Sequence, residues 1–346
     1  MGLFGRRRLF VVPPETPLVW GDDYMTRVRV AVVGCGRAQR EHYGHLSQRD
    51  DVELVGHCDV DGDRAAAAAE RYGGEAFTDH EAMYDQTRPS AVYVCVPPFA
   101  HSAPEEAAAM RGIHLFVEKP IALDRRTAKR ISATIRKAKI ITSVGYCWRY
   151  FDTVEHARKL IKSKAVCLVR GYWDGPMSEV WWWRRQDKSG GQLLEQTTHI
   201  VDLVRHLCGE VAEVHAIGST GCMSQVPDFD IHDSSVATLQ LKNGAAGVVT
   251  SVCVANGAGV KAGVEVVTPE AVFTLEHGTL TVREDGKTTE YAPRANIYAE
   301  QTDAFIESIK TGRKKGIRST YADALKTFLV TCAANESMAS GLPVKP

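Results

Sequence analysis

A lysine at the end of an apolar segment is the first candidate for chemistry. Lys119 follows residues 113–117, a run typical of a buried strand, and stands between Glu118 and Pro120. Open α/β sheets bind ligands beyond the carboxyl ends of their strands, so the amine is expected to face a ligand crevice. The proline could hold a fixed turn, cis or trans, that aims the amine. The alternative is a surface lysine after an edge strand.

A histidine in a later helical segment is the second candidate. His199 lies within residues 193–207, with Glu195 four positions before it and Asp202 three positions after it. This spacing predicts that the three side chains share one face of a single helix. A neutral imidazole beside a carboxylate is a competent general base near neutral pH. The alternative is an amphipathic helix with a buried, hydrogen-bonded histidine, but Gly190-Gly191 before the helix and the upstream lysine favour chemistry.

A dinucleotide-binding turn precedes both candidates. The β-branched run 28–33 leads into Gly34-x-Gly36 and a helical segment, and such a turn lets the backbone approach a pyrophosphate. Asp59 ends the next strand at the position that usually binds the adenosine ribose. Its carboxylate would repel a 2′-phosphate, which favours NAD over NADP. The chain departs from the usual motif at its third glycine position, which holds Gln39. The alternative for Gly34 and Gly36 is a tight turn that binds no ligand, and the alternative for Asp59 is an acid that only ends a strand.

Further cofactor contacts are expected beside the same strand ends. They are Arg37, Ala38, Val96, Pro97, His101, Glu118 and Lys119. His101 could equally begin a helix and touch no ligand. A cationic nicotinamide ring and the exclusion of bulk water would both make the Lys119 ammonium lose its proton more easily, so its pKa is expected to fall.

Aromatic and charged residues near the predicted domain junction suit a polyhydroxylated ligand. The expected substrate contacts are Lys119, Tyr146, Trp148, Arg149, Trp182, Glu195, His199 and Asp202. Residues 181–183 are three tryptophans that cannot all face one side, so one should line the cleft; packing alone is the alternative for each. Asp228, Asp230, His232 and Asp233 are irregularly spaced beside a strand start. They favour a solvated loop, and we predict no metal site.

Alternation of strand and helix patterns predicts the architecture. From residue 28 to residue 145 the segments alternate with short joints, as in a doubly wound parallel sheet. After Tyr150, short strands and turn signals predict a mostly antiparallel sheet, followed by two terminal helices. The predicted domains are 25–148, which binds the dinucleotide, and 149–346, which binds substrate and forms oligomers. Residues 1–24 are expected to be a disordered extension.

Bulk composition excludes several classes of protein. The 42 Lys and Arg balance the 42 Asp and Glu, which argues against nucleic-acid and membrane-surface binding. Nine cysteines without C-x-x-C spacing fit reduced thiols in the cytoplasm. No apolar run reaches the roughly 18 residues that span a bilayer.

Several motifs together resemble one enzyme family. They are Val33-Gly34-Cys35-Gly36-Arg37, Cys95-Val96-Pro97-Pro98 with His101, Val117-Glu118-Lys119-Pro120, Tyr146-Cys147-Trp148-Arg149-Tyr150 and the segment from Gly190 to Asp202. From about Val28 to the C-terminus, the chain resembles the glucose-fructose oxidoreductase / inositol dehydrogenase / rhizopine-catabolism (Gfo/Idh/MocA) family. The resemblance implies an N-terminal Rossmann domain and a C-terminal α/β domain with a large, mostly antiparallel open sheet. It also implies a dimer or tetramer formed through that sheet.

The resemblance also implies a reaction. In this family the lysine of the E-K-P motif and the helix histidine are the usual catalytic pair, matching Lys119 and His199. An aspartate commonly stands four residues before the histidine, where this chain has Glu195. The expected activity is NAD-dependent oxidation or reduction of a secondary alcohol of a sugar, sugar derivative or cyclitol. The alternatives are glycoside cleavage with tightly bound NAD through a transient 3-keto sugar, and a non-catalytic NAD-binding metabolite sensor.

Overall fold

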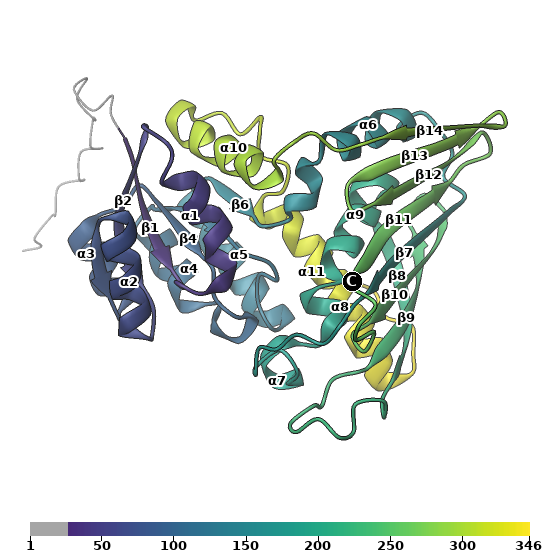
Figure 1. Cartoon of the computed structure of the whole chain (residues 1–346), viewed down its shortest axis with the longest axis horizontal. Coiled ribbons are helices and arrows are strands. Elements are labelled where there is room, and N and C mark those ends of the chain that lie inside the picture. The colour runs from purple at the N-terminus through teal and green to yellow at the C-terminus, as the bar shows by residue number, and fades with distance from the viewer. Residues whose placement is uncertain (1–26) are drawn as a thin grey trace, which may run out of the picture.

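Six parallel strands form the N-terminal sheet of the computed structural model, which describes residues 27–346 (Figure 1). The strands are β1 (Val28–Val33), β2 (Val52–Cys58), β3 (Glu75–Phe77), β4 (Ala91–Val94), β5 (His114–Val117) and β6 (Thr142–Val144). The helical segments between them are η1 (Arg37–Gln39), α1 (Arg40–Leu46), α2 (Gly62–Tyr72), α3 (His80–Thr87), η2 (Pro98–Ala100), α4 (Ala103–Met110) and α5 (Arg125–Ala138). The strand order is β3-β2-β1-β4-β5-β6, so the predicted doubly wound Rossmann sheet is confirmed. The expected extension at residues 1–24 lies outside the described residues.

This sheet is buried on both faces, as the continuous apolar strands predict. Along β1, Val30 and Val32 join one hydrophobic cluster, whereas Ala31 and Val33 join the cluster on the opposite face. Short polar caps then start the helices: the carboxylates of Asp61, Asp79 and Asp124 accept backbone N–H groups at the first turns of α2, α3 and α5. These caps fix where each helix begins after its loop.

Eight strands form the C-terminal sheet, in the order β14-β13-β12-β11-β7-β10-β9-β8. They are β7 (Leu168–Asp174), β8 (Val211–Ser219), β9 (Ser234–Leu241), β10 (Ala246–Val252), β11 (Lys261–Val267), β12 (Ala271–Glu276), β13 (Thr279–Glu284) and β14 (Lys287–Tyr291). Only the β7–β10 pair is parallel, so the mostly antiparallel prediction is confirmed. One face packs on α6 (Asp152–Ile161) and α9 (Thr198–Cys208). Burial alternates residue by residue along β9, as expected when the other face is open.

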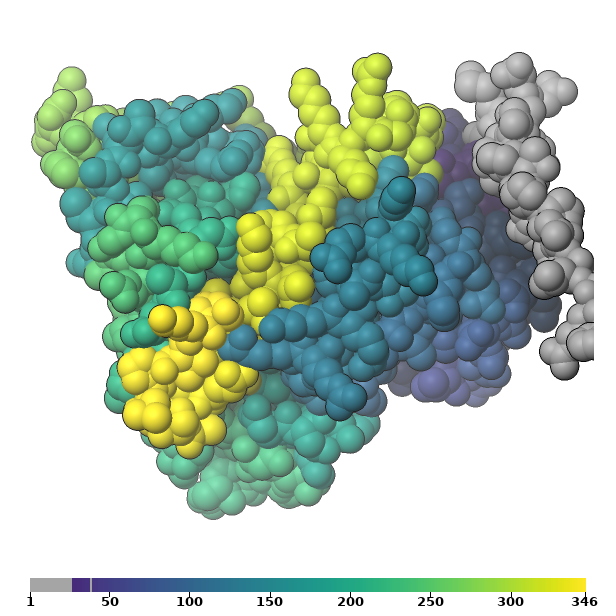
Figure 2. Space-filling model, turned by 180° about the vertical axis from the view of Figure 1, so that it is seen from behind, coloured from purple at the N-terminus to yellow at the C-terminus, as the bar shows by residue number. Residues whose placement is uncertain are grey.

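Two C-terminal helices bind the two sheets together. Phe305 and Ile306 of α10 (Ile297–Thr311) complete a cluster of the first sheet. Along α11 (Tyr321–Ser340), Phe328 packs into the first sheet's other cluster and Val330 into the core of the second sheet. Figure 2 shows the C-terminal residues, in yellow, between the two halves of the molecule.

One predicted helix is divided in two. Residues 193–207 were expected to be continuous, but α8 (Gln192–Glu195) and α9 are separate. At the break, the Thr197 amide donates to the Gln192 carbonyl at 3.1 Å, and its hydroxyl lies 2.7 Å from the Ser251 hydroxyl. The prediction that Glu195, His199 and Asp202 share one helix face is therefore wrong. No helix within residues 27–346 is long and apolar enough to cross a membrane.

Candidate active site

Lys119 and Glu195 meet at the boundary between the two halves of the chain. The Lys119 Nζ lies 2.9 Å from Glu195 Oε1 and also donates to the Glu195 backbone carbonyl at 3.0 Å. The Lys119–Pro120 peptide bond is cis, one of the two forms expected. The turn after β5 thus places the amine against the last residue of α8.

The ionisation of Lys119 differs from the expected direction. Burial lowers the pKa of this ammonium, but the carboxylates of Glu195 and Glu118 outweigh burial and raise the pKa above its ordinary value. The expectation of a lowered pKa considered burial and a neighbouring cation and omitted these two anions. The structure therefore presents Lys119 as a cation that can donate hydrogen bonds.

His199 lies in the first turn of α9 among aromatic rings. Trp148 and Trp173 lie nearly parallel to the imidazole, with ring centroids 5.9 and 6.1 Å away, and Tyr146 meets it edge-on at 6.0 Å. Burial, and then the nearby Lys119 ammonium, hold the pKa of His199 well below its ordinary value. The imidazole is therefore neutral at neutral pH and can accept a proton. Lys119 comes from the N-terminal half of the chain and His199 from the C-terminal half, and the ammonium lies near enough to act on the imidazole. Their joint role in catalysis stays a prediction.

The turn after β1 has the geometry that a dinucleotide requires. Gly34 has φ +91°, and a Cβ added there would lie 2.3 Å from the Cys95 carbonyl oxygen, so only glycine fits. A Cβ on Gly36 would meet open space, which leaves room on that side of the turn. The Asp59 carboxylate accepts the Cys35 amide at 2.8 Å and the Asp61 amide at 3.0 Å. The residues present therefore fit a dinucleotide, with Asp59 holding the turn.

Other predicted cofactor residues have mixed placements. Arg37 and Ala38 lie in η1, and Val96 and Pro97 are half-buried after β4. Glu118 is engaged by His42 at 2.8 Å and by the Lys119 amide at 3.1 Å, so it fixes the strand end. The His101 side chain is fully buried and paired with Glu105. The pairing with Glu105 ties His101 to the first turn of α4, and its contact with the cofactor stays a prediction.

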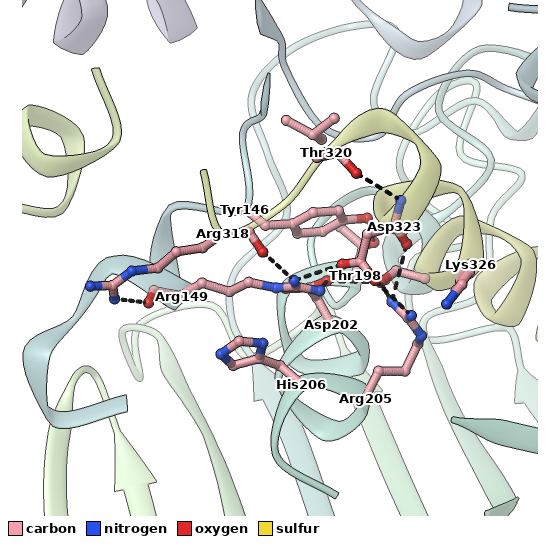
Figure 3. Close-up of polar contacts among 12 residues, drawn as sticks. Tyr146, Arg149, Thr198, Asp202, Arg205, His206, Arg318, Thr320, Asp323 and Lys326 are labelled. Atoms are coloured by element: carbon pink, nitrogen blue, oxygen red, sulfur yellow. Dashed lines mark hydrogen bonds and ion pairs between the residues drawn. The ribbon is translucent and has the colours of Figure 1, made fainter. Parts of the chain in front are cut away.

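Three predicted substrate contacts are buried within the protein (Figure 3). Arg149 binds both carboxylate oxygens of Asp202, at 2.7 and 2.6 Å, and the two residues are 3% and 1% exposed. The Tyr146 hydroxyl lies 2.9 Å from the Thr198 hydroxyl. Charge and spacing suggested substrate binding for these side chains, but their polar groups are satisfied inside the fold. They support the wall behind His199.

Sequence reasoning expected one tryptophan of the 181–183 run in the cleft but did not choose Trp183, and it missed Trp173. Trp183 is 1% exposed, and its indole N–H donates to Glu195 Oε2 at 2.8 Å; Trp173 lies beside His199. Trp182, the predicted substrate contact, is half-buried in the same loop as Trp183. A run of tryptophans predicts an aromatic loop, but the spacing of the tryptophans does not show which indole faces the reactive residues.

The acidic loop between β8 and β9 has structural contacts. Asp233 Oδ2 accepts the Cys222 amide at 2.7 Å, and Asp230 accepts the Gln186 amide. Within residues 27–346, no group of three or more His, Cys, Asp or Glu side chains is arranged to hold a metal ion. The prediction of no metal site remains a prediction.

Comparisons with known proteins agree with this geometry. Residues 28–146 match the family model described as "Oxidoreductase family, NAD-binding Rossmann fold", and residues 154–281 match the "GFO/IDH/MocA C-terminal domain". Myo-inositol 2-dehydrogenase of Thermotoga maritima is 28% identical over 231 residues, which are 64% of this chain and 67% of that protein. A 2,7-anhydro-N-acetylneuraminate hydratase of Mediterraneibacter gnavus is 28% identical over 195 residues, 55% of this chain and 51% of the relative.

A solved structure extends the likeness to nearly the whole fold. Levoglucosan dehydrogenase in complex with NADH and L-sorbose superposes with a TM-score of 0.82 at 21% identity, covering 93% of this chain and 99% of that chain. The sequence matches to the two curated relatives are shorter, spanning about half to two thirds of their lengths. The fold, the dinucleotide turn and the two family models agree: the chain belongs to the Gfo/Idh/MocA family of NAD-binding oxidoreductases.

Proposed function

We propose that this protein is an NAD-dependent dehydrogenase acting on a secondary alcohol of a sugar, sugar derivative or cyclitol. The observation that carries the proposal is the convergence of a cationic Lys119, paired with Glu195, and a neutral His199. The first supplies a hydrogen-bond donor and the second a proton acceptor. The myo-inositol 2-dehydrogenase relative supports the substrate class.

Each residue has a separate task in the proposed reaction. His199 takes the proton of the substrate hydroxyl, and the Lys119 ammonium donates to the same oxygen as negative charge develops on it. Glu195 keeps the ammonium charged and oriented. Gly34, Gly36 and Asp59 would hold the dinucleotide, and bound NAD would supply the hydride acceptor.

Asp59 supports a preference for NAD over NADP. Asp59 follows β2 beside the glycine turn, and two backbone amides fix its carboxylate there. A fixed negative charge at this position accepts ribose hydroxyls and repels a 2′-phosphate. Initial rates with the two cofactors would measure this preference directly.

The test is a substrate screen combined with two substitutions. Sugars, sugar acids, cyclitols and glycosides are incubated with NAD, and NADH formation is followed together with aglycone release. Lys119→Ala and His199→Ala should each lower kcat by about 10²-fold or more, because each removes a group that acts on the reacting oxygen. The Kd for NAD should stay close to that of the wild type. Lys137→Ala, at an exposed lysine of α5, is the matched control, and near wild-type turnover in both site variants would contradict the proposal.

A reaction without net oxidation is the second candidate. The hydratase relative belongs to a class of enzymes whose overall reaction forms no NADH. Glycoside cleavage through a transient 3-keto sugar would use the same Lys119 and His199 while NAD stayed bound. Release of aglycone without NADH would favour this candidate, whereas tight NAD binding without any turnover would favour a sensor.

We also infer a homodimer or homotetramer formed through the C-terminal sheet. The inference is supported by the open face of that sheet, on which Ile217 and Val236 are 67% and 47% exposed and lie opposite each other on β8 and β9. Exposed apolar side chains in contact with each other favour burial against a partner.

A further inference from the structure

The carboxylate of Glu195 is held from both sides. Lys119 Nζ binds Oε1 at 2.9 Å, and the Trp183 indole N–H donates to Oε2 at 2.8 Å. The two donors come from opposite halves of the chain, one from the turn after β5 and the other from the loop between β7 and α8. A glutamate side chain has several rotatable bonds, so two donors at fixed positions restrict it far more than one donor does.

The indole is itself fixed by a small core of its own. Trp183 packs with Ile231 and Cys253 in a buried cluster separate from the cores of the two sheets, and Met177 borders this cluster. Its backbone amide donates to the Val180 carbonyl at 3.0 Å. This packing holds the indole in place, so its N–H offers Oε2 of Glu195 a hydrogen-bond donor at a fixed position.

We propose that Trp183 is a positioning residue for the Lys119 ammonium and acts through Glu195. The inference rests on the proposed function, in which Lys119 donates to the reacting oxygen. Glutamate has one more rotatable bond than the aspartate common at this position in the family, so its carboxylate can take more orientations. The second donor, the Trp183 indole, selects one of them. Without the indole N–H, Oε2 lacks this donor and the carboxylate is free to rotate away from the amine.

The charge on Lys119 should report this rotation. The titratable groups that act on the amine are Glu195, Glu118, Cys147 and His199. Burial lowers the pKa of Lys119, and the two carboxylates raise it. If the Glu195 carboxylate moves away, it raises the pKa of Lys119 less, while burial still lowers it. The pKa of Lys119 therefore falls. A tryptophan that only fills space would have no such effect.

Trp183→Phe tests the inference, with Trp181→Phe as the matched control. Phenylalanine keeps an aromatic ring and removes the donor, and Trp181 belongs to the same loop but is 58% exposed and lies next to Phe99. Loss of a hydrogen bond to a charged group should lower kcat roughly 10-fold or more, with the Kd for NAD unchanged. Trp181→Phe should match the wild type.

A second measurement needs no substrate. The pKa of Lys119 is obtained from the pH dependence of its acetylation by trace acetic anhydride, read by mass spectrometry of the Lys119 peptide. Trp183→Phe and Glu195→Gln should each lower this pKa. Because the effect passes through Glu195, adding Trp183→Phe to Glu195→Gln should lower it no further. If Trp183→Phe fails to fold, replacing the indole by benzothiophene, which lacks the N–H and keeps the shape, removes the donor alone.

The outcomes separate the two proposals. Turnover by the wild type together with identical kcat and Lys119 pKa in Trp183→Phe and Trp181→Phe would overturn the positioning role and leave the dehydrogenase assignment standing. A lowered Lys119 pKa in Trp183→Phe without wild-type turnover of any substrate would support the positioning role and count against the dehydrogenase. A Lys119 pKa that falls further in the double variant than in Glu195→Gln alone would also contradict the route through Glu195.

Discussion

At the scale of single residues, His199 is oriented by stacking. Trp148 and Trp173 lie within 20° of its ring plane, and within residues 27–346 its Nδ1 is buried without a hydrogen-bond partner. Most general-base histidines are fixed through the second ring nitrogen, so the two indoles take over that task here. Aromatic contacts also exclude water from the ring, and this exclusion is the main reason why its pKa is low.

This environment predicts the pH profile. A base with a folded-state pKa below its ordinary value remains neutral as pH falls through 6.5, so kcat/KM should stay nearly constant there and fall only at more acidic pH. Lys119→Gln removes the nearby cation and should raise the pKa of His199. NMR titration of 15N-labelled histidine would measure this rise, with Lys137→Gln as the control. An acidic limb at or above pH 6.5 in the wild type would count against a buried neutral base.

The same low pKa predicts how stability depends on pH. Unfolded His199 has an ordinary pKa and binds a proton more readily than the folded residue does. Its contribution to the free energy of unfolding is therefore fully present above the unfolded pKa and is lost as pH falls below that value. Burial also lowers the pKa values of His57, which is buried, and of His114 and His206, which are half-buried, so they should act in the same direction.

Most residues of the candidate site could be predicted from local motifs, because each motif is defined by residues that are neighbours in the sequence. The glycine turn, Asp59 and the lysine after β5 are each part of a strand and the turn that follows it, and all three were predicted. Partners from distant segments were not. Spacing could not show that Arg149 and Asp202 satisfy each other, or that the Trp183 indole reaches Glu195. The pKa of Lys119 was misjudged for the same reason.

At the scale of elements, α9 is held by an ion network of Arg149, Asp202, Arg205 and Asp323 (Figure 3). Arg149 from η3 (Cys147–Tyr150) binds Asp202 of α9 and also lies 2.6 Å from Asp323 of α11. Arg205 of α9 lies 3.2 Å from the same Asp323. Three elements from different parts of the chain are thus joined by two nearly buried arginines, nearly buried Asp202 and half-buried Asp323, and the orientation of α9 depends on them.

Asp202→Asn should therefore destabilise the protein strongly. The substitution keeps the side-chain volume but leaves the Arg149 guanidinium, which is 3% exposed, without its bidentate anion. Removing one partner of a buried pair costs up to roughly 3–5 kcal/mol of unfolding free energy, and the remaining pair with Asp323 offsets part of that cost. Urea denaturation followed by circular dichroism measures the loss. Asp85→Asn, which breaks an exposed pair with Arg111, should leave the midpoint nearly unchanged, and equal midpoints for the two variants would refute a structural role of the network.

Long apolar elements were predicted well and small exposed ones were not. The strand β1 has the predicted bounds, residues 28–33, and the two predicted terminal helices are present as α10 and α11, because burial imposes a clear pattern on them. The edge strands β3 and β14 were missed, and all but one of their residues are exposed. The break between α8 and α9 arises from contacts of Thr197 with Ser251, which no local pattern records.

At the scale of the whole molecule, the open face of the C-terminal sheet carries a row of side chains across four strands. The strand pairings place Ile217, Val236, Thr250 and Tyr172 opposite one another on β8, β9, β10 and β7. The opposite face is covered by α6, α9 and α11. In a sheet covered on both faces, side chains in such a row would be buried in the core. We therefore expect a second copy of the chain to cover this face.

Charged substitutions on this row should separate the subunits. Ile217→Lys combined with Val236→Lys places two like charges directly opposite each other, which opposes burial against another copy. Light scattering after size-exclusion chromatography should give the mass of a dimer or tetramer for the wild type and a smaller assembly for the double variant. Met110→Lys changes a side chain of α4 that is 72% exposed and should leave the mass unchanged. A monomeric wild type, or an oligomer that survives both charges, would show that subunits do not meet through this part of the sheet.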